Sequence, residues 1–262
     1  MTHVITQEKY KSILEKLEKS KNYLGVIGST IVPLEIIAKT NPKNILLFDA
    51  NPEAIKFFEI YKKNILESNN NIEFIEKIFG LKSNEIEQLK DAYKNRLFLE
   101  SKDDFNNYWN SLNLEKRFDG EKDSLNHRFY KSSKEILEGS YFSEGESFFN
   151  NETRFNNLKD SLNGDNVKTT IANITSEEFS KIINQYFRKG IFSNNSIDLI
   201  SLSNIIPGDE ENPKMYLNET SFDKVKENLK TLNTSKRCKL VYGLNPIYQN
   251  LNDLLVKDYK EI

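Results

Sequence analysis

Residues Asn22–Pro52 read NYLGVIGSTIVPLEIIAKTNPKNILLFDANP, and this stretch decides the fold class. It begins with an apolar strand over Tyr23–Ile27 and passes through a short turn at Gly28. A helix follows, and a second apolar strand over Ile45–Phe48 closes the stretch. Strand, turn, helix and strand in this order predict a βαβ unit, the repeating unit of an open α/β sheet with parallel strands.

Asp49 closes the second predicted strand and follows Gly28 by 21 residues. In βαβ units that bind nucleotides, the backbone of the first turn approaches the ligand. A carboxylate about 20 residues later hydrogen-bonds the ribose hydroxyls. The spacing therefore predicts a ribose-binding Asp49, with Ala50 and Asn51 beside it in the pocket. The alternative is an ordinary βαβ unit in which Asp49 only caps the next helix through the Asn51-Pro52 turn.

The number of glycines in the first turn bears on which nucleotide is bound. A dinucleotide site uses G-x-G-x-x-G, because the pyrophosphate rests against bare backbone and a helix N-terminus. Here the turn reads Gly28-Ser29-Thr30, with one glycine, and Pro33 stands early in the next helix, where no N–H donor is required. S-adenosylmethionine (SAM) has no phosphate and suits such a turn. We therefore expect SAM as the cofactor rather than NAD or FAD, with Gly28, Ser29 and Thr30 beside its methionine part.

Composition excludes several classes of function. Lys and Arg total 37 against 39 Asp and Glu, so no strongly basic field predicts a nucleic-acid partner. One cysteine, Cys238, excludes an intramolecular disulfide and a thiolate zinc cluster, and it agrees with a cytoplasmic location. Two histidines are too few for a histidine metal site. No apolar run approaches the roughly 18 residues of a transmembrane segment, and the N-terminus lacks the apolar core of a signal peptide.

The alternation of strands and helices predicts three regions. Residues 1–71 are expected to hold an N-terminal helix and the first half of a SAM-binding domain. Residues 72–150 are expected to form a helical insertion on the substrate side, and residues 151–262 the second half of the domain. The further predicted strands are Val167–Ile171, Ser196–Leu202 and Arg237–Tyr242, and the predicted helices are Tyr10–Ser20, Pro52–Glu67, Glu152–Leu162, Ser176–Arg188 and Asn218–Leu232. The predicted fold is α/β and Rossmann-like, a mainly parallel sheet with helices on both faces and the insertion after the second β unit.

Polar residues follow the third and fourth predicted strands, at the sheet edge where ligands of open α/β sheets bind. Asn173, followed by Ile174, can both donate and accept a hydrogen bond, which suits the edge of adenine. Ser203 and Asn204 follow the fourth strand, where transfer chemistry would take place. For each asparagine an ordinary turn residue is the alternative, and the pattern leaves both interpretations open.

No Ser-His-Asp or Cys-His arrangement and no P-loop can be assembled from the sequence. SAM chemistry explains this, because the sulfonium is already a good leaving group and catalysis is mainly alignment and electrostatics. Aromatic residues of the insertion, Tyr108, Trp109, Tyr130 and Tyr141, are candidates for contacts with a small-molecule acceptor. The competing hypothesis is a non-catalytic Rossmann-like module that binds a nucleoside or a protein.

Several segments together point to one enzyme family. Within Tyr23–Gly80 these are GVIGS, FDANPEAI, FFEIYKKNI and FIEKIFG, and later in the chain they are RFNNLKDSL, TTIANI and IDLISLSNIIP. In these segments the chain resembles the SAM-dependent 3-amino-3-carboxypropyltransferases of betaine-lipid synthesis and their uncharacterised relatives. The pair Tyr108-Trp109 falls where that group often has a Tyr-Trp pair. The chain is shorter than is usual for the group, and its first turn is poorer in glycine.

The resemblance implies a SAM-binding fold of the class I methyltransferase type. It also implies transfer of either a methyl or a 3-amino-3-carboxypropyl group. The choice depends on which carbon of the sulfonium faces the acceptor, the methyl carbon or the γ-carbon of the methionine part.

Overall fold

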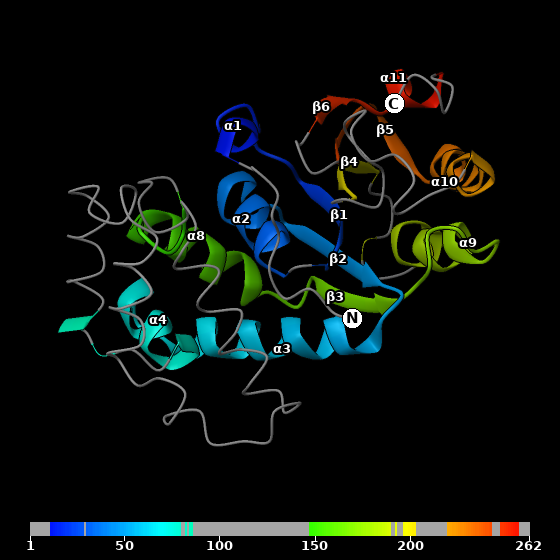
Figure 1. The fold of residues 1–262 in the computed structure, drawn as a ribbon. Helices are drawn as coiled ribbons and strands as arrows, with labels where there is room; N and C mark the ends of the chain where they lie inside the picture. The colour runs from blue at the N-terminus through cyan, green and yellow to red at the C-terminus, as the bar shows by residue number, and fades with distance from the viewer. Residues whose placement is uncertain are drawn as a thin grey trace, which may run out of the picture. The chain divides into compact units, whose positions relative to one another are not determined.

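The computed structural model describes residues 11–28, 30–79, 82, 84–85, 147–189, 192, 196–202, 219–242 and 247–256. Figure 1 shows their fold. The chain divides into two compact units, one formed by Met1–Phe58 with Asp160–Ile262 and the other by Glu59–Lys159. Most of the helical insertion expected over residues 72–150 lies outside the described residues.

The first unit contains a six-stranded sheet. Its strands are β1 (Asn22–Val26), β2 (Asn44–Asp49), β3 (Val167–Ile171), β4 (Ile197–Ser201), β5 (Thr234–Tyr242) and β6 (Ile247–Asn250). They lie in the order β3-β2-β1-β4-β5-β6, with β1 to β5 parallel and β6 antiparallel to β5. The predicted α/β class with a mainly parallel sheet is confirmed, and the strand order is compatible with a Rossmann-like fold.

The described residues also form helices in both units. These helices are α1 (Lys11–Leu14), α2 (Ile31–Thr40), α3 (Pro52–Glu67), α4 (Asn71–Phe79), α8 (Glu152–Leu162), α9 (Phe179–Asn184), the π-helix η3 (Gln185–Lys189), α10 (Glu219–Thr231) and α11 (Leu251–Leu255). None of these helices has the length and apolar character that crossing a bilayer requires.

Three elements differ from the prediction. The strand β6 was not predicted, because its four residues become a strand only by pairing with β5. The helix expected over Tyr10–Ser20 ends at Leu14. The helix expected over Ser176–Arg188 begins at Phe179 and changes to a π-helix at Gln185, while the Ser176 hydroxyl accepts a hydrogen bond from the Glu178 N–H at 3.2 Å.

One face of the sheet forms a continuous apolar core with α9, α10 and α11. Its centre is a row of residues in register across four strands, Leu46, Leu24, Ile200 and Leu240, which are all buried. Strand side chains alternate between faces, so every second residue of these strands joins this core. Phe48 meets Phe179 of α9 edge to face with ring centroids 5.0 Å apart. In Figure 1, α9 and α10 lie side by side on this face, and α2 lies on the other side of the sheet.

The opposite face contains a close contact at the centre of the sheet. The Tyr23 hydroxyl and Ser201 Oγ, both buried, lie 2.5 Å apart and join β1 to β4. The Tyr23 ring lies across Gly25, so a Cβ at that position would come within 2.6 Å of Tyr23 Cζ. The strand therefore requires glycine here because of packing, not because of backbone conformation.

Asparagine side chains join three strands at the amino edge of the sheet. Asn22 Nδ2 donates to the Ser196 carbonyl at 2.7 Å, and the Asn22 N–H donates to Asp198 Oδ2 at 3.2 Å. Asn44 Nδ2 donates to Asn22 Oδ1 at 2.6 Å. Because Asn22 is buried, these bonds replace water for its polar atoms and connect β2, β1 and β4.

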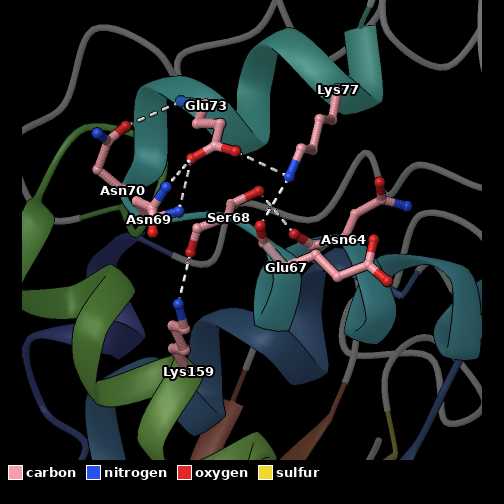
Figure 2. Close-up of polar contacts among 8 residues, drawn as sticks. All are labelled: Asn64, Glu67, Ser68, Asn69, Asn70, Glu73, Lys77 and Lys159. Atoms are coloured by element: carbon pink, nitrogen blue, oxygen red, sulfur yellow. Dashed lines mark hydrogen bonds and ion pairs between the residues drawn. The ribbon is translucent and has the colours of Figure 1, made fainter.

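In the second unit, side chains cap the junction between α3 and α4, as Figure 2 shows. Asn70 Oδ1 accepts from the Glu73 N–H at 2.9 Å, and Glu73 Oε2 accepts from the Asn69 N–H at 2.7 Å, a reciprocal N-terminal cap of α4. At the end of α3, Lys77 Nζ donates to the Glu67 carbonyl at 2.7 Å and Lys159 Nζ to the Ser68 carbonyl at 2.6 Å. These bonds satisfy groups that a helix end leaves without partners.

Phe74, on the buried side of α4, is the centre of the aromatic core of this unit. Its ring centroid lies 5.8 to 6.1 Å from those of Tyr61, Phe148, Phe149 and Phe155. The apolar spacing of α4 predicts this buried side, and the cap beside it orients the helix for that packing.

We expect Gly25→Ala to lower the free energy of unfolding by about 1–3 kcal/mol, the usual cost of overpacking. The new methyl group would overlap the Tyr23 ring. Gly164→Ala is the matched control, since a Cβ there meets nothing closer than 3.9 Å. Urea unfolding of both variants measures the difference. Equal effects of the two substitutions would contradict the close approach of Tyr23 to Gly25.

We expect Glu73→Gln to lower the thermal unfolding midpoint at pH 7. Hydrogen bonds from the Asn69 N–H and then from Lys77 hold the pKa of Glu73 below its usual 4.5. A carboxyl group whose pKa is lower in the folded protein than in the unfolded chain stabilises the fold at pH values above its unfolded pKa. This stabilisation is lost as the pH falls through the pKa of the folded protein. The difference in unfolding midpoint between Glu73→Gln and wild type should therefore disappear below pH 4.5.

Glu67→Gln is the control for this experiment, because the contact of the Glu67 carboxylate with Lys63 is long, 3.9 Å, and exposed. Such exposed pairs contribute little to stability. A gap for Glu73→Gln that persists unchanged at acidic pH would show that its carboxylate is not the stabilising group.

Candidate functional site

The candidate site lies at the carboxyl edge of the parallel strands, where the strand order reverses. From β1 the chain adds β2 and β3 on one side of the sheet, and it later adds β4 and β5 on the other. Connections therefore leave in opposite directions from β1 and β4. In open α/β sheets this is where ligands bind.

Asp49 joins the ends of β1 and β2 at this edge. Its Oδ2 accepts from the Gly28 N–H at 2.9 Å, and its Oδ1 accepts from the Asn51 N–H at 2.8 Å. Asn51 Oδ1 in turn accepts from the Glu53 N–H at 2.9 Å and so caps α3. The structure therefore brings together Gly28, Asp49 and Asn51, while Ala50 beside them is exposed.

The carboxylate of Asp49 keeps capacity for a ligand. A carboxylate offers about four lone-pair sites, and these two bonds use one on each oxygen. Asp49 is only half-buried. Each oxygen can thus accept one more hydrogen bond, the number that the two hydroxyls of a ribose would donate.

The turn after β1 has an unusual backbone. Gly28 has φ 47°, and Thr30 has φ 58°, a conformation that branched residues rarely adopt. The Thr30 N–H donates to the Ile27 carbonyl at 2.8 Å and closes the turn. For a residue other than glycine, such as Thr30, this conformation costs about 1–3 kcal/mol, and such residues are concentrated at functional sites.

The amino end of α2 follows this turn directly. Thr30 occupies the N-cap position but makes no side-chain cap hydrogen bond, and the first turn of α2 contains no acidic residue. Pro33 stands in that turn, as predicted. The first turn of α2 thus brings no carboxylate to the positive end of the helix dipole, a place that favours a negatively charged group.

The end of β3 lies beside Asp49 in the sheet. Ile171 pairs with Asp49, and the Ala172 N–H donates to the Asp49 carbonyl at 3.0 Å. Ile171 is 59% exposed. Paired residues point to the same face of a sheet, so an exposed apolar side chain neighbours the carboxylate.

Asn173, beyond β3, is part of a turn, which is the alternative that the sequence analysis left open for this residue. Its Oδ1 accepts from the N–H and the hydroxyl of Thr175 at 3.1 and 3.0 Å. The side chain is exposed, whereas Ile174 is buried in the core. Asn173 thus stabilises its own loop with its oxygen, and its Nδ2 group remains as a possible donor to a ligand.

The other predicted site residues lie outside the described residues. These are Ser29, Ser203, Asn204, Tyr108, Trp109, Tyr130 and Tyr141.

Two buried contacts of the sheet and its helices were not predicted from the sequence. They are the Tyr23–Ser201 hydroxyl pair, and Asn228 of α10, which donates to the Ile174 and Ser176 carbonyls. Neither has a local sequence signal, because the partners stand 178 and more than 50 residues apart.

Burial disfavours the ionised form of two titratable groups of β5. Burial, and to a smaller extent Asp198, raises the pKa of the Cys238 thiol to about 12. Burial raises the pKa of Tyr242 above its usual 10. Among the described residues no group of three His, Cys, Asp or Glu could hold a metal ion. No protein-family model matches the chain, and no curated protein matches it.

We expect Asp49→Asn to lower the free energy of unfolding by about 1.5–3 kcal/mol, the range for hydrogen bonds to charged groups. The two oxygens accept from different N–H groups, so the amide would leave one N–H without an acceptor. Urea unfolding measures this. Asp165→Asn, the same change at an exposed residue, should stay within about 0.5 kcal/mol of wild type. If Asp49→Asn were equally mild, the bridge between β1 and β2 would not stabilise the fold.

Proposed function

We propose that the protein is a SAM-dependent transferase that moves a methyl or a 3-amino-3-carboxypropyl group to a small-molecule acceptor. The observation that carries the proposal is the Asp49 carboxylate, bonded to the Gly28 N–H at the carboxyl edge of the sheet. In this proposal the remaining lone pairs of Asp49 accept hydrogen bonds from the ribose hydroxyls. The proposed fold is of the class I methyltransferase type.

Two neighbouring features support the same ligand. The amino end of α2 favours a negative charge, such as the carboxylate of the methionine part, and the single glycine of the turn suits a ligand without a pyrophosphate. On the other side of Asp49, exposed Ile171 offers apolar surface for a purine ring, and Asn173 offers a hydrogen-bond donor. In this proposal the adenine and the methionine part extend in opposite directions from the ribose.

The chemistry needs no protein nucleophile. In methyl transfer, a lone pair of the acceptor bonds to the methyl carbon, and the carbon–sulfur bond breaks with its electron pair on sulfur. S-adenosylhomocysteine leaves, and the acceptor proton passes to a base or to water. Attack on the γ-carbon instead transfers the aminocarboxypropyl group and releases methylthioadenosine. We propose that Ser203 and Asn204 face the reaction and that Tyr108, Trp109, Tyr130 or Tyr141 contact the acceptor.

One observation favours a second candidate, a non-catalytic module that binds a nucleoside or a protein. Both Asp49 oxygens already accept backbone N–H groups, which is what a purely structural carboxylate does. Incubation with SAM and pooled amine, hydroxyl and thiol acceptors separates the two candidates. Release of S-adenosylhomocysteine or methylthioadenosine supports the transferase and identifies the transferred group. Binding of SAM without turnover of any acceptor supports the module.

We expect Asp49→Asn to weaken binding of S-adenosylhomocysteine by about tenfold or more, because ribose would lose a charged acceptor. Calorimetric titration measures the affinity. Asn22→Ala is the control, since it breaks hydrogen bonds of β1 at the opposite, amino edge and should lower stability without changing affinity. No heat from wild type with SAM or S-adenosylhomocysteine would refute the cofactor, and unchanged affinity in Asp49→Asn would refute the role of Asp49.

A further inference from the structure

Asn228 fastens the loop that follows β3 to α10. Its side chain is 8% exposed, and its Nδ2 donates to the Ile174 carbonyl at 2.7 Å and to the Ser176 carbonyl at 2.9 Å. An amide nitrogen carries two hydrogens, so both donors are used. The course of residues 174–176 therefore depends on a side chain from another element, more than 50 residues later in the chain.

This loop determines which end of the Asn173 amide is available to a ligand. The Thr175 N–H and hydroxyl both donate to Asn173 Oδ1, at 3.1 and 3.0 Å. The oxygen and nitrogen of an amide are told apart by such a network, because two donors must face the oxygen. The Nδ2 group is thus the end that remains for a ligand, and the loop presents a donor.

A donor fixed opposite N1 of a purine discriminates between adenine and hypoxanthine. Unprotonated adenine has acceptors at N1, N3 and N7, whereas hypoxanthine carries a hydrogen on N1. A donor directed at N1 bonds to adenine and opposes hypoxanthine. Discrimination of this kind requires that the amide hold its orientation, because a freely turning amide would offer its oxygen to the hypoxanthine hydrogen.

We propose that Asn228 is a positioning residue for adenine selection. By holding the carbonyls of Ile174 and Ser176, it keeps Thr175 bonded to Asn173 Oδ1 and the Asn173 Nδ2 group directed at the base. The proposal rests on the proposed function, since it assumes an adenosyl ligand at this edge of the sheet.

Asn184 provides a matched control on the same pair of helices. Its Nδ2 donates to the Thr231 carbonyl at 2.9 Å, and its Oδ1 accepts from the Asn233 N–H at 2.9 Å. It therefore joins the last residues of α9 and α10, while Asn228 joins α10 to the loop before α9. Asn→Asp at either position removes an NH2 donor and places a carboxylate against carbonyl oxygen.

The experiment compares Asn228→Asp and Asn184→Asp in the full chain by calorimetric titration with S-adenosylhomocysteine and with its hypoxanthine analogue. Wild type should prefer the adenine compound by about tenfold, the effect of one hydrogen bond. Asn228→Asp should lose most of this preference, and Asn184→Asp should retain it. Urea unfolding of both variants shows whether they lose comparable stability, and a ratio of two affinities is insensitive to such a loss.

Thr175→Val tests the same loop if Asn228→Asp does not fold. It removes the hydroxyl donor to Asn173 Oδ1 and leaves Asn228 intact, and it should reduce the preference about threefold. If wild type prefers adenine and both loop variants keep that preference, Asn228 has no positioning role while the proposed function stands. If wild type binds neither compound, the proposed function fails and this inference with it.

Discussion

The carboxylate of Asp49 is the interaction on which the carboxyl edge of the sheet depends. It holds the Gly28 N–H of the first turn on one oxygen and the Asn51 N–H on the other. Asn51 then caps α3 through the Glu53 N–H. The end of β1, the end of β2 and the start of α3 are thus connected through the side chains of Asp49 and Asn51. Hydrogen bonds to a charged acceptor contribute about 1.5–3 kcal/mol each, which is large against the total stability of a domain.

Contacts below this edge make a strained turn tolerable. Thr30 has a backbone conformation that costs about 1–3 kcal/mol, and it persists only where the surroundings define it. The contacts of β1 with its neighbouring strands fix the chain before the turn along the whole length of the strand. Asn22 is bonded to β2 and β4 at the amino edge, and the hydroxyl pair of Tyr23 and Ser201 joins β1 to β4 at the centre. A strand held at its start, centre and end leaves the chain little freedom to relax the turn.

Local patterns predicted the elements that local forces form. The apolar runs identified β1 to β5 within a few residues, and the helices over Pro52–Glu67 and Glu152–Leu162 were predicted with their observed limits. The elements that failed depend on contacts with residues outside their own segment. β6 is a strand because β5 lies beside it, and the helix after Ser176 changes to a π-helix where Phe187 packs against Phe192. At the site, spacing related Asp49 to Gly28, but no pattern in the sequence could relate Asn228 to the loop after β3, because that contact is made by the fold alone.

The structural and functional interpretations of Asp49 are compatible, because they use different lone pairs. A carboxylate that rotates freely loses this rotational freedom when it binds a ribose, and the loss of entropy weakens binding. Here the Gly28 and Asn51 N–H groups already fix its plane, so its remaining lone pairs are oriented before a ligand arrives, which is the principle of preorganised sites. The same logic applies to Asn173, whose oxygen is held by Thr175 so that its nitrogen keeps one direction. At both positions the polar group uses one part of its hydrogen-bonding capacity to stabilise the protein. The same bonds orient the remaining part, which is therefore well prepared to recognise a ligand.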